Sequence, residues 1–567
     1  MKLFKGIKNW LENQEHLFYL FLLVLIAPNL ALCFTEPISV VAKVCNVLLP
    51  LSAYYMLMTL SRNCGKMFWA LFLFVFFGAF QIVLLYLFGQ SIIAVDMFLN
   101  LVTTNSSEAM ELLDNLIPAL VTVVVLYIPP LVLATISIVR KHKLSVSFIR
   151  RERKRAFGGL LIGLVSLAAA FLFDAKYELK ADLYPVNVCY NVGLAFQRTA
   201  QTQNYDKTSK DFVFNARPSH AIEKREIYVM VIGETSRALN WQLMGYARET
   251  NPELMTQQGL IPFSKVLTES NTTHKSVPML MSGVTACTYD SIYYQKSILT
   301  AFKEAGFQTA FFSNQRFNHS FIDFFGKEAD TFEFIKEDSL NTDSNPSDLE
   351  LMRCVTKELA KGANKLLIVL HTYGSHFNYR ERYPATEAYF KPDYPADAEP
   401  KFKNNLVNAY DNSLRYTDKL LKRLISLLDE QQTDAVLAYT SDHGEDIFDD
   451  SRNLFLHASP VPSYYQLHVP FLLWMSDSYR ETYPECWTAA TANRQKDISS
   501  SSSFFPTMLN LAGIKTSYCA DDLSVVSPSY EMRPRVYLND HNEPRALNDL
   551  GMRKPDFEKL DQQGIRY

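Results

Sequence analysis

Acidic and histidine side chains follow two apolar stretches that are typical of buried strands. Glu234 comes directly after 227–233, and Asp442 and His443 come directly after 435–441. For the second cluster alone, a polar turn with a permissive glycine is an equally good explanation. However, two carboxylates and an imidazole form a ligand set that suits Zn²⁺, with Mn²⁺ as a second choice. Because parallel strands deliver their C-terminal ends to one crevice, the sequence predicts a shared metal site.

The segment 268–283, TESNTTHKSVPMLMSG, offers hydroxyl groups in a loop that opens into a possible helix. A hydrolase or a transferase needs a nucleophile, and an alcohol becomes an effective one when a bound cation lowers its pKa. This segment is therefore the candidate source of the nucleophile.

Apolar runs and amphipathic stretches alternate from residue 225 onward. Several runs are continuously apolar, as expected when helices cover both faces of a sheet. This pattern predicts an α/β domain with a mainly parallel sheet sandwiched by helices. The predicted strands are 227–233, 309–313, 366–372, 435–441 and 470–475, and the predicted helices are 298–305, 348–361, 407–429 and 503–512.

The first third of the 567 residues is much more apolar than the remainder. Five segments there approach the ~20 residues that a helix needs to cross a bilayer. Repeated segments of this kind argue against a single cleaved signal peptide. The predicted transmembrane helices are 17–35, 38–60, 67–89, 117–139 and 156–174.

Basic residues set the predicted orientation of these helices. Lysines precede the first one, the stretch 140–155 before the fifth is strongly basic, and the loop 90–116 has no Lys or Arg. By the positive-inside rule, the N-terminus is cytoplasmic and the chain after about residue 175 is exported. Topology and anionic lipid explain the basic stretch, and a net charge of −3 gives no reason to expect nucleic acid as a partner.

The sequence thus predicts three parts: a transmembrane domain over 1–175, an interfacial linker over 176–224 and an exported catalytic domain over 225–567. The linker contains the amphipathic run NVCYNVGLAFQRTAQTQ. Such a run fits a helix on the membrane surface, and a surface helix of the globular domain is the alternative.

Five cysteines lie in the exported part, where disulfides can persist. One or two bridges are expected there, although the pairing cannot be read from one sequence. These residues are Cys189, Cys287, Cys354, Cys486 and Cys519.

Five motifs taken in order resemble those of the bacterial phosphoethanolamine transferases. They are GETSR, NTTHKSVPMLMSG, LHTYGSHFNYRERYP, SDHGE and LFLHASP. This family is a membrane-anchored branch of the alkaline phosphatase and sulfatase superfamily, and its N-terminus has five spans. A sulfatase would need a Cys/Ser-x-Pro-x-Arg motif, which the nucleophile loop lacks. The resemblance therefore favours transfer of a phosphoryl group.

The resemblance implies specific roles for the candidate residues. The family's nucleophile is the Thr of a Thr-x-x-Ser-x-Pro pattern and falls on Thr273, whereas neighbouring Thr272 remains a loop hydroxyl without a role. The family's zinc ligands fall on Glu234, Thr273, Asp442 and His443.

The resemblance also distinguishes among the histidines. Two family histidines that contact phosphate or a second metal fall on His376 and His457. His371 and His468 match no such role and are expected to be structural. Some members carry a Cys shortly after the motif's proline, but here Met279 follows Pro278, so the disulfide pattern departs from the family.

A segment between the third and fourth spans matches the family's Asn-x-x-x-Thr-x-x-x-Glu pattern. Asn100, Thr104 and Glu108 recur every four residues, so a helix would place them on one face. A polar stripe on a surface helix is the alternative. The resemblance implies that this segment lines a donor-lipid pocket, where Glu108 can pair with the ethanolamine ammonium.

The resemblance implies that phosphatidylethanolamine donates phosphoethanolamine through a phosphothreonine intermediate to lipid A, the lipopolysaccharide core or another envelope glycolipid. The protein would lie in a bacterial inner membrane, surrounded by membrane lipids, with a periplasmic catalytic domain. Two alternatives remain: an anchored phosphoglycerol transferase of the lipoteichoic acid synthase type, and a non-catalytic membrane sensor with a sulfatase-like domain.

Overall fold

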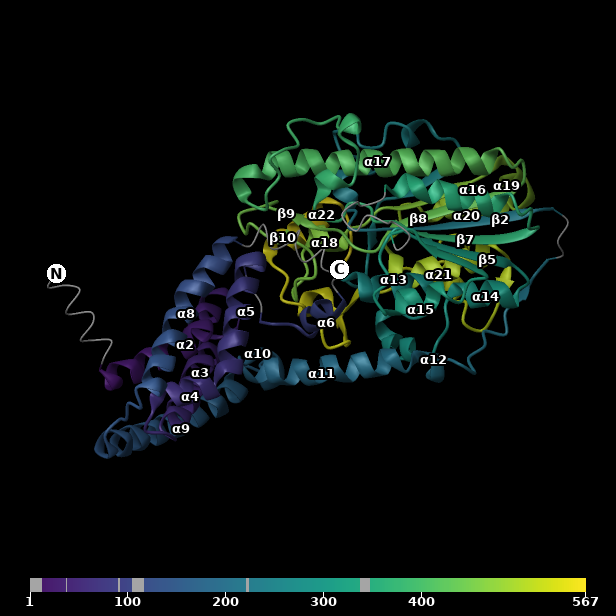
Figure 1. Cartoon of the computed structure of the whole chain (residues 1–567). Helices are drawn as coiled ribbons and strands as arrows, with labels where there is room; N and C mark the ends of the chain where they lie inside the picture. The colour runs from purple at the N-terminus through teal and green to yellow at the C-terminus, as the bar shows by residue number, and fades with distance from the viewer. Residues whose placement is uncertain (1–12, 37, 90–91, 104–116, 221–223, 337–346) are drawn as a thin grey trace. The chain divides into compact units, whose positions relative to one another are not determined.

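The computed structural model describes residues 13–36, 38–89, 92–103, 117–220, 224–336 and 347–567. The chain forms two compact units (Figure 1). Unit 1 consists of residues 1–98 and 112–196, and unit 2 consists of residues 99–111 and 197–567.

Unit 1 is built from apolar helices. Four of its described helices are long and apolar enough to cross a membrane: α2 (Gln14–Thr35), α3 (Val40–Met58), α8 (Ile117–Val139) and α9 (Val146–Phe173). The predicted helix 67–89 is instead a pair, α4 (Cys64–Ala70) and α5 (Phe72–Phe88), bent by 62°. The bend occurs because Leu71 leaves the helical conformation, with φ −93° and ψ 13°. If α4 and α5 together cross the membrane as one bent span, the described helices provide five candidate spans.

Helix α9 begins ten residues before the predicted start of the fifth span, at Val146 instead of 156. Ser145 caps it by accepting a hydrogen bond from the Phe148 N–H. The second part of the basic stretch, residues 146–155, therefore forms the first turns of this helix, while 140–145 connects it to α8. Arginine and lysine propagate a helix about as well as leucine, so charge alone does not end one.

The amphipathic run predicted in the linker is helical. It forms most of α11 (Val186–Gln203), which follows the short α10 (Leu179–Asp182) and precedes α12 (Tyr205–Thr208). The boundary between the two units falls within α11. Contact of this helix with a membrane surface stays a prediction.

Unit 2 is an α/β structure around a seven-stranded sheet of order β3-β11-β8-β2-β7-β5-β6. The five strands from β8 to β6 are parallel, whereas β11 is antiparallel to both of its neighbours. The strands are β2 (Glu226–Gly233), β3 (Leu260–Phe263), β5 (Gln308–Ser313), β6 (Thr331–Phe334), β7 (Lys365–His371), β8 (Asp434–Ser441) and β11 (Phe471–Met475).

All five predicted strands are confirmed, and each observed end lies within one residue of its predicted position. The missed strands, β3 and β6, are the two edges of the sheet. Each has only four residues and is partly exposed, so neither contains a long apolar run. The predicted helices correspond to α14 (Ile298–Glu304), α16 (Leu351–Leu359), α17 (Lys403–Asp429) and α21 (Ser500–Leu511).

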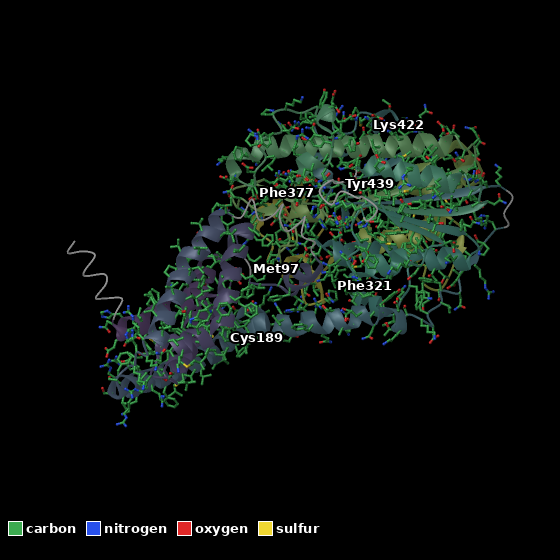
Figure 2. The ribbon with its side chains drawn as sticks, in the orientation of Figure 1. Met97, Cys189, Phe321, Phe377, Lys422 and Tyr439 are labelled. Atoms are coloured by element: carbon green, nitrogen blue, oxygen red, sulfur yellow. The ribbon has the colours of Figure 1, made fainter. Side chains whose placement is uncertain are left out.

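Side chains from both faces of the sheet enter separate apolar cores. Along β2, Tyr228, Met230 and Ile232 join one core, while Ile227 and Val229 join the other. In Figure 1, α16 and α17 cover one face and α13 (Thr273–Met281), α14 and α21 cover the opposite face. Figure 2 shows the side chains between these layers, including buried Tyr439 on β8. Burial on both faces explains why the strand sequences are continuously apolar.

All eight cysteines lie among the described residues, and all are free thiols. The expectation of one or two disulfides is therefore wrong. The sheet separates the candidates, because Cys354 lies in the core beneath α16 whereas Cys486 lies in the core on the other face. Cys287 and Cys189 are exposed.

A reducing agent is therefore expected to leave the stability of the protein unchanged. Thermal unfolding of the detergent-solubilised protein, followed by circular dichroism with and without dithiothreitol, should give the same midpoint within error. A midpoint that falls in dithiothreitol would mean that a disulfide contributes, since loss of one typically costs roughly 2–5 kcal/mol.

Candidate metal centre and nucleophile

The candidate residues gather at the C-terminal ends of four adjacent parallel strands. Glu234 follows β2, Asp442 and His443 follow β8, His371 ends β7, and Gln315 lies two residues past β5. This is the edge where an open α/β sheet forms its ligand crevice. The fold thus brings together residues more than 200 positions apart in the sequence.

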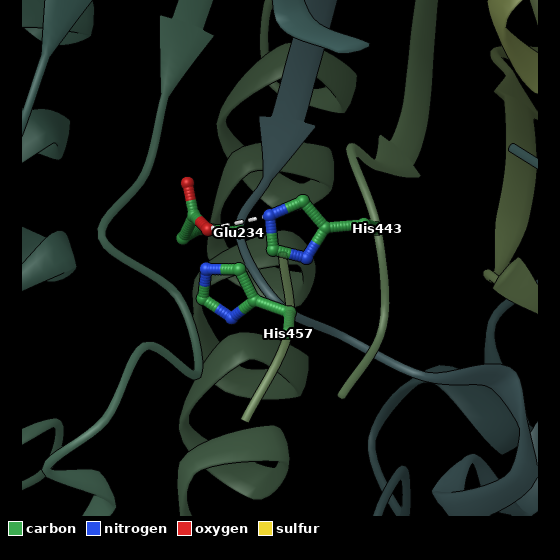
Figure 3. A group of neighbouring side chains, drawn as sticks. All are labelled: Glu234, His443 and His457. Carbon is green, nitrogen blue, oxygen red and sulfur yellow. Dashed lines mark ion pairs between the residues drawn. The ribbon is translucent and has the colours of Figure 1, made fainter. Parts of the chain in front are cut away.

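The predicted metal ligands converge around one point. His443 Nε2 lies 3.5 Å from Glu234 Oε1 and 3.2 Å from Asp442 Oδ2. Thr273 Oγ1 lies 3.1 Å from the same nitrogen and 3.3 Å from Glu234 Oε1. Ligand atoms of Glu234, His443 and His457 also lie within 4.8 Å of one another (Figure 3). His457 therefore joins the possible ligands, whereas the sequence assigned it only to phosphate or a second metal.

The donor set fits a divalent cation. Asp442 Oδ2 is buried, and apart from His443 Nε2 at 3.2 Å no donor among the described residues contacts it, an arrangement that is costly for a carboxylate oxygen. Burial and the Asp442 charge raise the pKa of Glu234. Burial alone would lower the pKa of His443, but the Asp442 and Glu234 carboxylates raise it above its usual value. The raised pKa values of Glu234 and His443 both mean that the cluster favours bound positive charge, whether a proton or a cation.

Three histidines at the site each place Nδ1 against an oxygen. Nδ1 of His443 lies 2.9 Å from the Gly444 carbonyl, Nδ1 of His457 lies 3.1 Å from Glu445 Oε1, and Nδ1 of His376 lies 2.7 Å from the Phe377 carbonyl. The carbonyl partners of His443 and His376 can only accept, so Nδ1 of these two rings carries the N–H and Nε2 is the nitrogen left for a cation. Metal-binding histidines commonly carry such a partner on the other nitrogen.

His376 and His457 are held as neutral rings. Burial and then the His443 charge lower the pKa of His457 to about 3, and burial together with His457 and Arg382 lowers that of His376 well below its usual value. The two ring centroids lie 5.9 Å apart. Neutral rings are suited to binding a metal or accepting a hydrogen bond rather than to donating a charged hydrogen bond.

Gln315 contacts the centre, although the sequence did not single it out. Its side-chain nitrogen donates to Glu234 Oε2 at 2.9 Å and lies 3.2 Å from His371 Nε2. His371, expected to be structural, therefore contacts the centre through the side chain of Gln315. A polar residue just beyond a predicted strand was the available signal, the same one that identified Glu234.

Glu445 was present in the SDHGE motif but received no role. It is fully buried, accepts a hydrogen bond from the Tyr379 hydroxyl at 2.6 Å and contacts His457 Nδ1. Burial raises its pKa to about 8. Its position fixes the ring of His457. His468, by contrast, bonds to Tyr464 and the Ser264 carbonyl and stands outside the centre, as expected.

Thr273 is the first residue of α13, and Thr272 is the preceding cap residue. The N-terminus of a helix carries partial positive charge and favours an anion such as phosphate. Thr273 is partly exposed, whereas Thr272 is buried and contacts Ser270 Oγ. Of the two hydroxyl groups, the one on Thr273 therefore faces the donor cluster.

The backbone around the centre adopts left-handed conformations at residues with side chains. Leu456 and Ala458, on either side of His457, have φ of 67° and 61°, and Thr235 after Glu234 has φ of 58°. Residues other than glycine pay energy for this conformation. Gly444 is required for a different reason: a Cβ there would lie 2.2 Å from the Tyr465 carbonyl oxygen.

A cavity of about 210 Å³ in unit 2 lies beside the nucleophile helix. Its lining combines cationic or titratable side chains with aromatic rings, including Arg198, His274, Lys275, Tyr289 and His319. His274 and Lys275 directly follow Thr273. The cavity can therefore accept a group with an anionic part and an apolar part next to the hydroxyl.

The predicted donor-lipid segment falls largely outside the described residues. Asn100 lies on α6 (Val95–Thr103), although the placement of its side chain is not described, and Thr104 and Glu108 are not among the described residues. Their role stays a prediction.

Comparison with protein families adds an independent observation. A profile of the family described as Sulfatase matches residues 226–514, slightly more than half of the chain. The chain belongs to the sulfatase family. The match begins at β2 and includes every strand end described above, whereas residues 515–567 lie beyond it.

Curated relatives confirm the resemblance to phosphoethanolamine transferases. Phosphoethanolamine transferase EptA of Escherichia coli K12 is 29% identical over 319 residues, which cover 53% of this chain. The chain spans only 56% of the length of that relative. Phosphatidylethanolamine transferase Mcr-2 of E. coli is 27% identical over 406 residues, 67% of this chain and 74% of Mcr-2.

Solved structures confirm the fold. Lipooligosaccharide phosphoethanolamine transferase A of Neisseria meningitidis, an integral membrane protein, matches with a TM-score of 0.72 and 20% identity, covering 90% of this chain and 97% of that one. The periplasmic domain of E. coli EptC, solved in complex with zinc, matches with a TM-score of 0.54 and 24% identity, covering 60% and 98%. Apolar N-terminal helices followed by an α/β unit with a mainly parallel sheet are thus a known arrangement.

The geometry predicts that replacing Asp442 reduces metal binding. Asp442→Asn removes the charge of the buried carboxylate but keeps its shape, so zinc retained after dialysis should fall well below that of wild type. Asp434→Asn is the matched control, because Asp434 is a buried carboxylate at the opposite end of the same strand. Elemental analysis of the purified proteins provides the measurement, and equal zinc in both variants would contradict the site.

Proposed function

We infer that this protein is a membrane-anchored phosphoethanolamine transferase that uses zinc. Its donor is phosphatidylethanolamine, and its acceptor is lipid A or another envelope glycolipid. The main support is the position of the Thr273 hydroxyl, 3.1 Å from His443 Nε2 at the N-terminus of α13. The activities for which the relatives are named provide the second support.

The proposed zinc site consists of Glu234, Asp442, His443 and the Thr273 hydroxyl, with His457 as a further donor. Zinc bound there would lower the pKa of the hydroxyl and offset charge on phosphoryl oxygens. The buried Asp442 oxygen supports this ligand set, as does Nε2 of His443, which lies 3.2 Å from that oxygen and 3.1 Å from Thr273 Oγ1. Zinc in the EptC structure is consistent with it.

In the proposed first step, Thr273 Oγ1 attacks the phosphorus of phosphatidylethanolamine. A Thr273–phosphorus bond forms, the bond to the glycerol oxygen breaks, and diacylglycerol leaves after taking up a proton. The threonine proton leaves toward the oxygens of Glu234, which lie 3.3 and 3.4 Å away. The N-terminus of α13 favours the negative charge that develops on the phosphoryl group.

In the second step, an acceptor oxygen displaces Thr273 and releases the modified acceptor. When the acceptor is a hydroxyl, its proton passes toward Glu234, and the released Thr273 oxygen takes up a proton from the same carboxyl group. The neutral rings of His376 and His457 can hold the acceptor or the phosphoryl group. Splitting the transfer in two allows one site to serve two lipids in turn. The basic and aromatic cavity beside α13 provides space for the phosphate of either lipid.

The apolar helices of unit 1 support an inner-membrane location with a periplasmic catalytic domain. We retain the proposed division into 1–175, 176–224 and 225–567. The names of the relatives favour phosphoethanolamine over phosphoglycerol as the transferred group. The complete set of hydroxyl, carboxylates and histidines argues against a non-catalytic sensor.

Thr273→Ala should abolish the covalent intermediate. Intact-mass spectrometry of enzyme incubated with phosphatidylethanolamine should detect added phosphoethanolamine on wild type and none on this variant. Thr272→Ala is the matched control and should keep the adduct, because Thr272 faces Ser270. An adduct on the Thr273 variant would assign the nucleophile elsewhere.

Glu108→Ala is expected to reduce transfer without changing zinc content, because the ethanolamine ammonium would lose its charged partner. Glu108→Gln should be intermediate, since it keeps a polar group of the same shape. Asn100→Ala and Thr104→Ala should also reduce transfer. Rates from detergent-solubilised enzyme with a native acceptor test these outcomes, and wild-type rates in all three alanine variants would exclude this segment from the active site.

A further inference from the structure

A short strand near the C-terminus contacts the loop that carries the nucleophile. Strand β14 (Val536–Leu538) lies beyond the part of the chain that the sulfatase profile matches. The hydroxyl of Tyr537 donates to Asn271 Oδ1 at 2.6 Å. Asn271 lies two residues before Thr273, so this hydrogen bond holds the chain immediately upstream of the nucleophile.

Two further bonds flank the nucleophile on both sides. The Leu538 N–H donates to the Glu269 carbonyl at 2.8 Å. The ammonium of Lys275, two residues after the nucleophile, donates to the Asn539 carbonyl at 3.1 Å. Three consecutive residues, 537–539, thus bond to both sides of Thr273.

Asn271 also forms hydrogen bonds with residues in the loop that contains His457. Its side-chain nitrogen donates to Gln466 Oε1 at 2.6 Å and to the Ser459 carbonyl at 2.8 Å. Its own carbonyl accepts from the Ala458 N–H at 3.2 Å. Every polar atom of the Asn271 side chain is therefore used, and two of its partners directly follow His457 in the chain.

Gln466 connects Asn271 to Asp446, which lies three residues after His443. Its nitrogen donates to Asp446 Oδ2 at 2.6 Å, and Asp446 also accepts from Ser463 Oγ at 2.8 Å. Tyr537, Asn271, Gln466 and Asp446 are all at most 3% exposed. Hydrogen bonds in such a setting are strong and strongly directional because water does not compete for them.

Apolar packing anchors β14 at this position. Tyr537 belongs to a cluster that joins the C-terminal segment to residues flanking the two loops: Leu267, Tyr464, Tyr465, Leu467, Leu547, Met552, Leu560 and Ile565. The ring of Tyr537 is thus fixed independently of its hydroxyl. Because packing fixes the ring, the Tyr537 hydroxyl can hold the Asn271 side chain in one position.

We propose that β14 is a clamp on the nucleophile loop and that Tyr537 is a positioning residue for Thr273. The clamp deepens the transferase function proposed above, and its catalytic part rests on that function. Without the Tyr537 hydroxyl, Asn271 Oδ1 would be buried without a donor and the loop would relax toward another partner. Small displacements of a nucleophile are costly because attack requires near-ideal geometry.

Tyr537→Phe tests the clamp because it removes one oxygen and keeps the ring in the cluster. Hydrogen exchange of the full-length protein in detergent, read on peptides covering 268–276, should be about tenfold faster or more than in wild type. In transfer from phosphatidylethanolamine, kcat should fall roughly 10- to 100-fold while KM for the donor stays within about twofold. Zinc content should not change, because the Tyr537 hydroxyl donates to Asn271, which is not one of the proposed ligands.

Tyr464→Phe is the matched control. Tyr464 lies in the same cluster and is equally buried, but its hydroxyl bonds to His468 Nδ1 at 2.7 Å, away from the nucleophile. This variant should keep wild-type exchange over 268–276 and wild-type kcat. A general loss of packing would affect both variants alike and would argue against a clamp.

The two measurements separate the possible failures. Unchanged exchange over 268–276 in Tyr537→Phe would overturn the clamp whatever the reaction is. Faster exchange with unchanged kcat would overturn the positioning role. If wild type transfers nothing from phosphatidylethanolamine, the proposed function fails, whereas hydrogen exchange still decides whether β14 holds the loop.

Discussion

Two buried carboxylates at the ends of neighbouring strands impose the strongest requirement in this protein. Glu234 and Asp442 are each at most 1% exposed, and like charges in a low-dielectric interior need positive charge beside them. A cation and the ring of His443 can meet that requirement together. The side-chain amide N–H of Gln315 and the backbone N–H groups at the N-terminus of α13 add partial positive charge at the same place. Phosphate chemistry suits this environment because the compensating charges are in place before the substrate arrives.

The sequence was most informative where one physical effect dominated. Strands covered on both faces had to be continuously apolar, so five of the seven strands in the main sheet were recognisable. Glu234, Asp442 and His443 stood out only in combination, because each cluster alone is explained equally well by a polar turn or a cap, whereas two such clusters directly after predicted parallel strands indicate a shared site. The edge strands β3 and β6 lacked this signal, since a short, partly exposed strand needs only a few apolar residues.

Other features could not be predicted because they arise from tertiary contacts. Gln315 and Glu445 resemble ordinary polar residues until the fold places them against Glu234 and His457. The absence of disulfides depends on which face of the sheet each cysteine occupies, which spacing does not reveal. Contact between Tyr537 and Asn271 joins positions 266 residues apart, and nothing local in either segment indicates it.

The left-handed residues around His457 have a consequence for how the centre forms. Leu456 and Ala458 each hold an unfavourable conformation that costs of order 1–3 kcal/mol and that a free loop would abandon. The loop keeps it because Leu456 pairs with Asp446 in a short ladder and Ala458 bonds to the Asn271 carbonyl. The position of His457 therefore depends on contacts with both the nucleophile loop and the segment beyond His443. The centre should therefore form cooperatively, since loss of either contact would release the strained loop and with it the ring of His457.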